Sequence, residues 1–251
     1  MSVWEALAIL GVGLLAGTVN TIVGSGSLIT FPTLLAFGYS PVTANVSNTV
    51  GLVFGAASGS FGYRRELRGQ RRRVLILGSG SFVGGLAGGI LLLTLPSSVF
   101  DAVVPVLILL ACALVVAQPR LSAWVANHRS KHVEHGGPML YACVLATGVY
   151  GGYFGAAQGV ILLSMLGIFI SDSMHRLNGV KNVLALIANG VAAILFLFSA
   201  HVVWEVSALL AVGSIVGGQT GAQIGRRISV PALRALIVVV GLVAAIKLMV
   251  D

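Results

Sequence analysis

The sequence predicts an all-α protein that crosses a membrane several times, and three observations lead to this fold class. The 251 residues are 57% hydrophobic and only 9% charged, whereas about a quarter of the residues in a soluble domain are charged. The mean hydropathy is +1.00. The apolar residues also form continuous runs, each close to the roughly 20 residues that a helix needs to cross the hydrocarbon core. A chain of this composition has lipid as its solvent.

The apolar runs define the expected membrane helices. They are Val3–Val23, Val42–Phe61, Val74–Leu95, Val99–Val116, Met139–Ala156, Asn178–Phe198, Val203–Ile224 and Val230–Met249. Helices are preferred over a barrel because the runs do not alternate, and because lipid requires backbone groups to be bonded within their own segment. No Lys or Arg precedes the first run, so we interpret it as a membrane helix and not as a secretory signal. Counting the shorter segments between the runs, we expect about 8–10 transmembrane segments, some of them broken or re-entrant.

The second half of the sequence repeats the first, which predicts two membrane repeats, residues 1–117 and 139–251, joined by a polar cytoplasmic linker at 118–138. The matches are Gly17 and Gly24 with Gly152 and Gly159 at a shift of 135 residues, Asn48 with Asn182 at 134, and Gly80, Gly84, Gly85 and Gly88 with Gly213, Gly217, Gly218 and Gly221 at 133. One slowly drifting shift indicates a duplication. Many of these glycines recur every fourth residue, a spacing that lets helices pack closely in lipid.

The basic residues predict the orientation of the repeats. The loop Arg64–Arg73 carries six arginines, and such loops stay in the cytoplasm. If Val3–Phe37 forms a hairpin, spanning or re-entrant, the three further crossings of each repeat invert the second repeat. This arrangement places 12 of the 15 Lys and Arg residues in the cytoplasm, and the other three, Lys181, Arg234 and Lys247, lie inside helices. The cytoplasmic residues are Arg64, Arg65, Arg68, Arg71, Arg72, Arg73, Arg120, Arg129, Lys131, Arg176, Arg226 and Arg227. A parallel arrangement places Arg176, Arg226 and Arg227 outside, so we expect inverted-topology repeats.

Each repeat also contains a short segment that follows a glycine-rich interruption, and these two places form the predicted substrate site. The interruption Gly24–Ser27 precedes Leu28–Phe37, which reaches about half way across a bilayer at about 1.5 Å per residue. Ala157–Gly159 precedes the similarly short Val160–Ile170. Paired interrupted segments point to the binding site of a carrier, and the positive end of a half-helix suits an anion.

The candidate substrate-binding residues come from both interruptions and from the helices that follow them. They are Asn20, Thr21, Gly24, Ser25, Gly26, Ser27, Asn45, Asn48, Gln158, Gly159, Asn178, Lys181 and Asn182, with Ser47, Thr49 and Asn189 as further polar neighbours. An ionisable residue in a membrane helix, such as Lys181, is a functional candidate, although its side chain could instead reach the interface. For Asn20, Asn45 and Asn48 the alternative is hydrogen bonding that only holds helices together.

Other functional sites find little support in the sequence. No Gly-x-x-x-x-Gly-Lys-Ser/Thr motif occurs, and the basic loop is explained by topology without nucleic acid. No catalytic triad or paired-carboxylate constellation is evident, so we predict no catalytic residue and no cofactor. His128, His132 and His135 could lie on one helix face as metal ligands, but we interpret them as part of a solvated basic loop and predict no metal. A membrane-embedded enzyme or sensor is therefore the weaker alternative.

Several of these features resemble the sulfite exporter TauE/SafE family. In the stretch Gly13–Gly62 the resemblance rests on Gly17, Gly24-Ser25-Gly26, Pro32, Gly38, Asn48 and the tail Gly59–Arg65, and Gly148–Asn189 resembles the second copy of the family motif. The resemblance implies a bacterial inner-membrane transporter of sulfite, sulfoacetate or another organosulfonate, driven by an ion gradient. Ala156, Ala157 and Gln158 stand where the family often has small glycines, which leaves the substrate preference open.

The residues and the resemblance together predict a secondary transporter that works by alternating access. Its expected partners are a small anionic solute, the lipid bilayer and a coupling proton or other ion. A carrier of a non-sulfur anionic metabolite is the alternative within the same class. The sequence leaves the direction of transport and the oligomeric state open.

Overall fold

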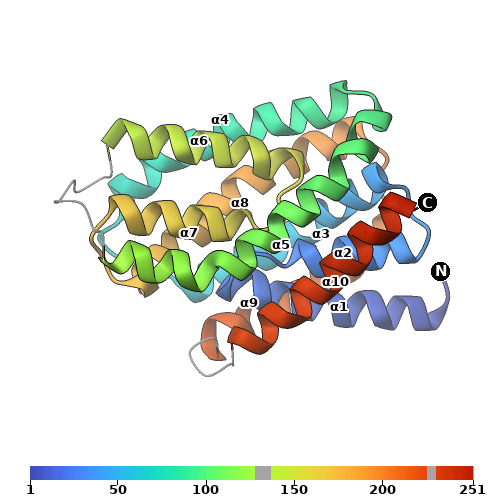
Figure 1. The fold of residues 1–251 in the computed structure, drawn as a ribbon, viewed down its shortest axis with the longest axis horizontal. Helices are drawn as coiled ribbons and strands as arrows, with labels where there is room; N and C mark the ends of the chain where they lie inside the picture. The colour runs from blue at the N-terminus through green and yellow to red at the C-terminus, as the bar shows by residue number, and fades with distance from the viewer. Residues whose placement is uncertain (128–136, 225–229, 251) are drawn as a thin grey trace.

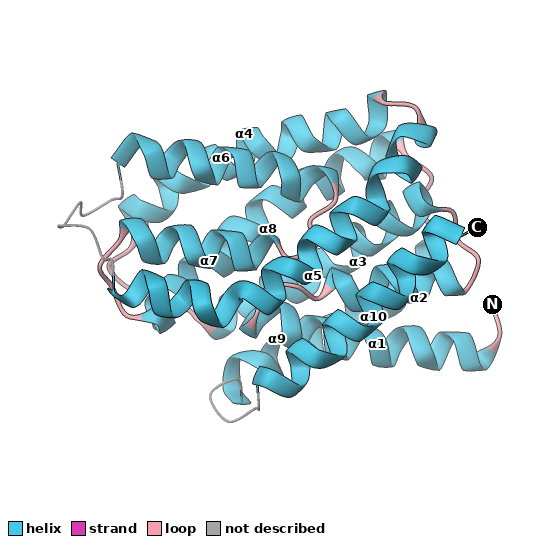
Figure 2. Cartoon of the chain, viewed as in Figure 1, coloured by secondary structure: helices cyan, strands magenta, loops and turns pink. Residues whose placement is uncertain are grey.

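Ten helices make up the regular structure of the residues that the computed structural model describes, which are 1–127, 137–224 and 230–250. They are α1 (Val3–Ile22), α2 (Ser27–Ala36), α3 (Pro41–Gly62), α4 (Arg71–Thr94), α5 (Ser97–Asn127), α6 (Gly137–Tyr153), α7 (Gln158–Phe169), α8 (Met174–Ser199), α9 (Trp204–Ile224) and α10 (Val230–Val250). Short loops connect most of them (Figure 2). Within this part of the chain, four helices are long and apolar enough to cross a membrane, namely α1, α4, α8 and the segment Ser97–Arg120 of α5. The prediction of an all-α polytopic membrane protein is confirmed.

Local sequence signals set the ends of α1. At its start the Ser2 hydroxyl accepts a hydrogen bond from the Glu5 N–H, and the Glu5 carboxylate accepts one from the Ser2 N–H, which forms a capping box. The helix stops just before Gly24, whose φ of +89° is rare for a residue with a side chain. At the other end of the first half, α5 continues to Asn127 and so extends into the predicted linker at 118–138.

The two short helices reach the centre of the molecule from opposite ends. In Figure 1, α1 enters from the right and α2 returns to the right, whereas α6 enters from the left and α7 returns to the left. The tips of both hairpins lie in the middle of the molecule. The chain therefore folds back at Val23–Gly26 and at Phe154–Ala157 without leaving on the far side.

The two halves of the sequence exchange helices. Helix α9 of the second half packs along α1 and α3, and α4 of the first half packs along α6 and α8. Helix α2 packs against α1, α3 and α10, and α7 packs against α6, α8 and α5. We call α1, α2, α3, α9 and α10 the first body and the remaining helices the second body. The bodies meet where α3 contacts α8, where α5 contacts α10 and α3, and at the hairpin tips.

Glycines make the packing within each body very close. A Cβ atom on Gly217 of α9 would lie 2.0 Å from the Leu14 oxygen of α1, and one on Gly88 of α4 would lie 2.0 Å from the Val149 oxygen of α6. Leu14 and Val149 correspond at the shift of 135, so Gly88 is the counterpart of Gly217 at a shift of 129. The predicted match of Gly84 with Gly217 was therefore wrong. The difference of four residues is about one helical turn, and small residues at every fourth position fit either register.

One end of the molecule gathers arginines around a single carboxylate. Asp172 lies 2.9 Å from Arg73 and 3.0 Å from Arg176, and Arg176 also donates to the Arg68 carbonyl oxygen. Burial alone would raise the pKa of Asp172, but hydrogen bonds from Arg73, the Ser173 N–H and Arg176 outweigh it and hold the pKa below its usual value. The loops at 63–70 and 170–173 thus lie at the same end, as the orientation argument requires. Of the basic residues assigned to this side, Arg129, Lys131, Arg226 and Arg227 lie outside the described residues.

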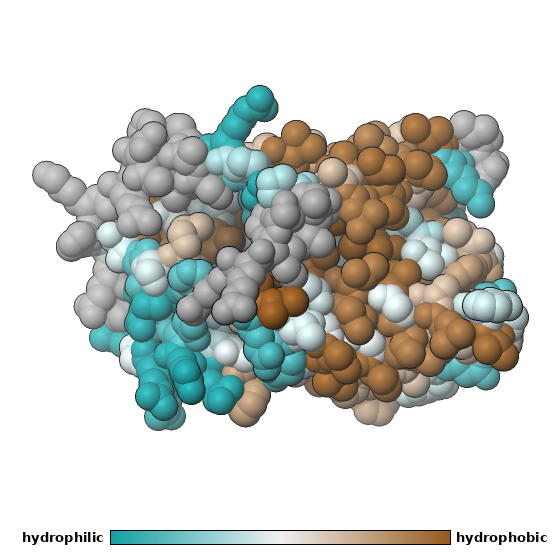
Figure 3. All heavy atoms as spheres, turned by 90° about the horizontal axis from the view of Figure 1, so that it is seen from below, coloured by the Kyte–Doolittle hydropathy of each residue, from teal (hydrophilic) through white to brown (hydrophobic). Residues whose placement is uncertain are grey.

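The opposite end carries aromatic and acidic residues. Burial first, and then the carboxylates of Glu5 and Glu205, raise the pKa of the Tyr39 hydroxyl above its usual value, which places the starts of α1 and α9 near the loop before α3. Trp4 and Trp204, beside these two glutamates, are 81% and 64% exposed. Exposed tryptophans are typical of the membrane interface. Seen from below, apolar residues cover most of the right side of the molecule and hydrophilic residues gather at the left (Figure 3).

Candidate functional site

The two interruptions predicted from the sequence meet each other at the centre of the molecule. The Gly159 N–H donates to the Gly24 carbonyl oxygen at 3.0 Å. A Cβ atom on Gly24 would lie 2.4 Å from the Gly159 Cα, and one on Gly159 would lie 2.5 Å from the Gly24 Cα. These are the two glycines that the sequence comparison matched at a shift of 135, and they contact each other directly. A side chain at either position would push the two hairpin tips apart.

Helix α8 supplies hydrogen-bond donors to the last carbonyl groups of α1. Lys181 Nζ donates to the Asn20 oxygen at 3.1 Å and to the Thr21 oxygen at 3.2 Å. The side-chain amides of Asn178 and Asn182 also donate to the Thr21 oxygen. A cation is stabilised at the carboxyl-terminal end of a helix, where the dipole is negative. Lys181 is only 1% exposed, so its side chain does not reach the interface, and that alternative is excluded.

Helix α3 supplies a hydrogen-bond donor to the end of α6 at the second interruption, and it also forms hydrogen bonds with α2 at the first interruption. The Asn45 amide donates to the carbonyl oxygen of Tyr153, the last residue of α6, at 3.0 Å. Thr30 Oγ1 donates to the Asn48 side-chain oxygen, and the Asn48 side-chain nitrogen donates to Ser27 Oγ at 3.3 Å. Helix α8 thus stabilises the first interruption, and α3 stabilises both. The contacts of Asn45 and Asn48 agree with the alternative that these residues form hydrogen bonds between helices.

A small enclosed cavity lies beside the meeting point of the two hairpin tips. Its lining residues come from α1, α2, α3, α7, α8 and the loop before α7, and they are Asn20, Ser27, Thr49, Leu52, Val53, Ala56, Gly155, Gln158, Gly159, Ala185 and Asn189. None of them is charged. The space open to the centre of a water molecule is about 20 Å³, which is enough for about one water. A larger solute requires the surrounding helices to move apart.

The polar residues around this cavity include hydrogen-bond donors that have no acceptor in the described part of the chain. Asn189 Nδ2 donates to the Ala185 oxygen, which fixes its amide, and also to Gln158 Oε1 at 2.9 Å. The Gln158 side chain therefore turns its Nε2 away from Asn189, and this buried nitrogen has no partner among the described residues. Ser27 Oγ accepts from Asn48, so its hydroxyl proton remains free to donate. A buried donor without an acceptor is unusual in a folded protein and needs an explanation.

The start of α2 adds backbone donors. Within the described residues, no hydrogen bond is formed by the N–H groups of Ser25, Gly26 and Ser27, and the buried Ser25 hydroxyl also lacks a partner. The first N–H groups of α7 are occupied instead, for example Gly159 by Gly24 and Val160 by Ala157. Free N–H groups and a positive dipole end favour an anion. The first interruption is thus better suited to hold one than the second.

The structure divides the predicted site residues into two groups. Asn20, Ser27, Gln158 and Gly159 line the cavity, as do the polar neighbours Thr49 and Asn189. The residues Thr21, Gly24, Ser25, Gly26, Asn45, Asn48, Asn178, Lys181 and Asn182 surround the hairpin tips without lining the cavity. The sequence argument missed Gly155 and the apolar wall that Leu52, Val53, Ala56 and Ala185 form. Asn189 follows Asn182 by seven residues, and this helical spacing could have ranked it higher.

No group of three His, Cys, Asp or Glu side chains that could hold a metal ion is found in the described part of the chain. The candidate ligands His128, His132 and His135 lie outside the described residues.

Two broken hairpins that meet at an enclosed polar cavity inside a helical membrane protein are the architecture of a solute transporter. The family model described as sulfite exporter TauE/SafE matches residues 9–248. The chain belongs to this family and is a membrane transporter. The predicted family resemblance is confirmed.

Curated relatives agree with this assignment. The probable membrane transporter protein YfcA of Escherichia coli is 25% identical over 244 residues, which cover 96% of this chain and 88% of the relative. A probable membrane transporter protein of Haemophilus influenzae is 26% identical over 98% of this chain and 96% of its own length. A probable membrane transporter protein, ORF9 of a Sinorhizobium species, is 26% identical over 94% and 89%. No solved structure matches the chain.

Proposed function

We propose that this protein is a secondary transporter of a small sulfur-containing anion, such as sulfite, sulfoacetate or another organosulfonate. The observation that carries the proposal is Gln158, which lines a cavity without acidic lining residues and whose buried Nε2 has no hydrogen-bond partner among the described residues. The hydroxyl and the free N–H group of Ser27, at the start of α2, supply further donors for oxyanion oxygens. Lys181 donates a hydrogen bond to the backbone oxygen of Asn20, which lines the cavity, and so holds this wall in place without touching the solute.

The transport mechanism that we propose is alternating access between the two bodies. In this proposal the two halves are inverted repeats with one hairpin on each side of the cavity, and the close glycine contacts make each body rigid. A Cβ atom on Gly190 of α8 would lie 3.6 Å from Val53 Cγ2 of α3, so the packing at this glycine is looser than inside the bodies. The close approach of Gly24 to Gly159 joins the bodies at the hairpin tips. The seam between α3 and α8 then opens toward one side of the membrane and afterwards toward the other. The moving units are the exchanged bodies and not the two halves of the sequence.

The proposed location is the inner membrane of a bacterium, with the Arg64–Arg73 loop in the cytoplasm. The clustering of Arg68, Arg73 and Arg176 at one end supports this orientation through the positive-inside rule. Coupling to a proton gradient is part of the proposal and comes from the family resemblance.

Flux into proteoliposomes tests the proposed function. We expect sulfite or an organosulfonate to accumulate unchanged inside the vesicles, and we expect an imposed pH gradient to alter the rate. A carboxylate that is carried while all sulfur anions are excluded would favour the non-sulfur carrier. Conversion of the added solute to a product would instead favour a membrane enzyme. Flux that does not respond to the pH gradient would remove proton coupling.

A substitution at the cavity makes the test specific. Gln158→Leu removes the free donor at similar volume, and we expect uptake at low substrate concentration to fall at least about tenfold, because losing a hydrogen bond to a charged group costs about 1.5–3 kcal/mol. Asn182→Leu serves as the matched control, since Asn182 lies outside the cavity and the Thr21 oxygen keeps two other donors. Equal flux by wild type and Gln158→Leu would contradict the assignment of this cavity to the solute.

A further inference from the structure

A second and larger hollow lies on the outer surface of the molecule, between α2 and α10. It is lined by Pro32, Thr33, Leu35, Ala36, Gly38, Tyr39, Pro41, Val239, Val240, Val243, Ala244, Lys247 and Leu248, and its volume is about 550 Å³. It shares no lining residue with the central cavity. We call it the α2–α10 groove.

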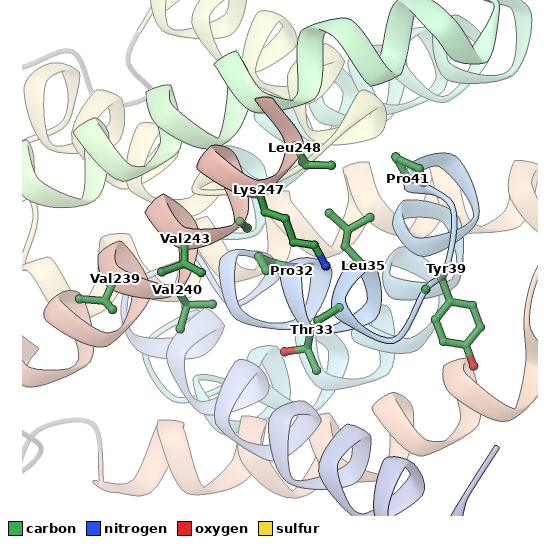
Figure 4. Close-up of a pocket in the computed structure, with 13 residues that line it drawn as sticks. Pro32, Thr33, Leu35, Tyr39, Pro41, Val239, Val240, Val243, Lys247 and Leu248 are labelled. Carbon is green, nitrogen blue, oxygen red and sulfur yellow. The ribbon is translucent and has the colours of Figure 1, made fainter. Parts of the chain in front are cut away.

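The walls of this groove are almost entirely apolar, and its polar groups are few. The Thr33 hydroxyl is already used, because it donates to the Ile29 oxygen. Figure 4 shows Lys247 extending from α10 across the groove toward Leu35 and Thr33. Its ammonium group has no hydrogen-bond or ion-pair partner among the described residues. A cation placed over an apolar channel is suited to a ligand with an anionic head and an apolar tail.

The level of the groove in the membrane follows from its neighbours. Tyr39 lies at one end of the groove, and its pKa is raised by burial and then by the nearby carboxylates of Glu5 and Glu205. The exposed Trp4 and Trp204 precede these glutamates, and such aromatic residues mark the headgroup level. Lys247 shares this end of the groove with Tyr39, in the last turn of α10. The apolar part formed by Val239, Val240 and Val243 therefore extends into the hydrocarbon region.

Charge distribution indicates which ligand fits. Lys247 is the basic side chain among the lining residues of the groove, whereas the opposite end gathers the Arg64–Arg73 loop and Arg176. The carboxylates of Glu5 and Glu205 lie on the Tyr39 side of the groove, which leaves Lys247 as the group that attracts a phosphate. Exposed α10 residues next to the groove, such as Leu242 and Ile246, face lipid tails.

We propose that the α2–α10 groove binds a glycerophospholipid, with the phosphate on Lys247 and one acyl chain along Val239, Val240 and Val243. Because α2 also carries Ser27 at the central cavity, a lipid held here lies against the helix that begins at the transport site. The lipid occupies the surface of the first body and does not enter the cavity.

Binding can be measured on purified protein in lipid-free detergent by thermal unfolding and by mass spectrometry of the intact complex. We expect dioleoylphosphatidylglycerol to raise the melting temperature and to remain bound as a discrete adduct. Dioleoylglycerol, which has the same chains but no phosphate, and inorganic phosphate alone should each fail. Lys247→Gln should weaken binding about fivefold, as expected for one cationic contact near the membrane surface, whereas Lys247→Arg should retain it.

Two tryptophan variants separate the groove from general lipid contact. Val243→Trp fills the groove and should abolish the adduct, while Leu242→Trp on the same helix, outside the groove, should leave it unchanged. Lipid-free melting temperatures confirm that both variants fold. The proposal is overturned if Lys247→Gln binds as well as wild type, if dioleoylglycerol or free phosphate binds equally well, or if Val243→Trp changes only the oligomeric mass, which would identify the groove as a contact with a second copy.

Discussion

The buried side chain of Lys181 supplies hydrogen bonds to the carbonyl groups at the end of α1. Its ammonium group bonds the carbonyl oxygens of Asn20 and Thr21, and burial to 1% exposure makes it one of the largest fully buried side chains. The sequence identified Lys181 as unusual, but its acceptors lie more than 150 positions away in the chain. Only the packing of α8 against the first hairpin tip brings these atoms together, so no local pattern could have predicted the contact.

We expect Lys181→Met to lower the free energy of unfolding by about 1–3 kcal/mol, the usual cost of a buried acceptor without a donor. The Asn20 oxygen loses its donor, while the Thr21 oxygen keeps Asn178 and Asn182. Thermal unfolding in lipid-free detergent measures the change, and the exposed Lys247→Met is the control. A stability gain would mean that removing the buried charge outweighs the lost hydrogen bonds.

The carboxylate of Asp172 gives a pH-dependent prediction. Its pKa is lowered in the folded protein, so its stabilising effect is complete above the unfolded value of about 3.9 and is lost as the pH falls through the folded value. Wild-type melting temperatures should therefore drop below about pH 4, and Asp172→Asn should lack this part of the drop. At pH 7 we expect the variant to lose about 1 kcal/mol or less. Asp101→Asn, at an exposed position, should behave like wild type.

At the scale of helices, the glycine contacts decide which helices pair. Gly217 and Gly88 leave no space for a side chain, whereas a Cβ atom on Gly11 would meet nothing within 4 Å. We expect Gly217→Ala and Gly88→Ala each to destabilise the protein by about 1–3 kcal/mol or more through overpacking. Gly11→Ala should be neutral or stabilising by about 0.5–1 kcal/mol. Melting curves and gel-filtration profiles of the three variants provide the comparison. If all three variants behave alike, the close packing is not what holds these pairs together.

The same contacts explain what sequence analysis could and could not predict at this scale. Composition predicted the helices, and the glycine-rich interruptions correctly located both short helices, α2 and α7. The predicted sequence alignment of α9 with α4 was wrong by one helical turn. Small residues at every fourth position still match each other after a shift of one turn.

At the scale of the whole molecule, the exchange of α4 and α9 defines the bodies that would move. In a background without Cys112 and Cys143, a Val53→Cys, Gly190→Cys pair links α3 to α8 across the seam. A Thr18→Cys, Thr220→Cys pair links α1 to α9 inside the first body, where the two hydroxyl oxygens are 3.2 Å apart. We expect oxidation to reduce flux at least about tenfold for the first pair, reversibly with a reductant, because conformational steps gate turnover. The second pair should transport normally. The opposite pattern would refute motion between these bodies.

The exchanged helices also affect how the protein is synthesised. When the ribosome has released only α1 to α5, the glycine face of α4 has no α6 to pack on, and the carbonyl groups of Asn20 and Thr21 have no donors from α8. In lipid such groups are costly. The newly inserted first half is therefore an incomplete intermediate, and we infer that insertion machinery or other membrane proteins shield it until α9 is made. Errors in late synthesis would then leave a membrane-inserted fragment with exposed polar groups, a form that quality-control proteases can recognise.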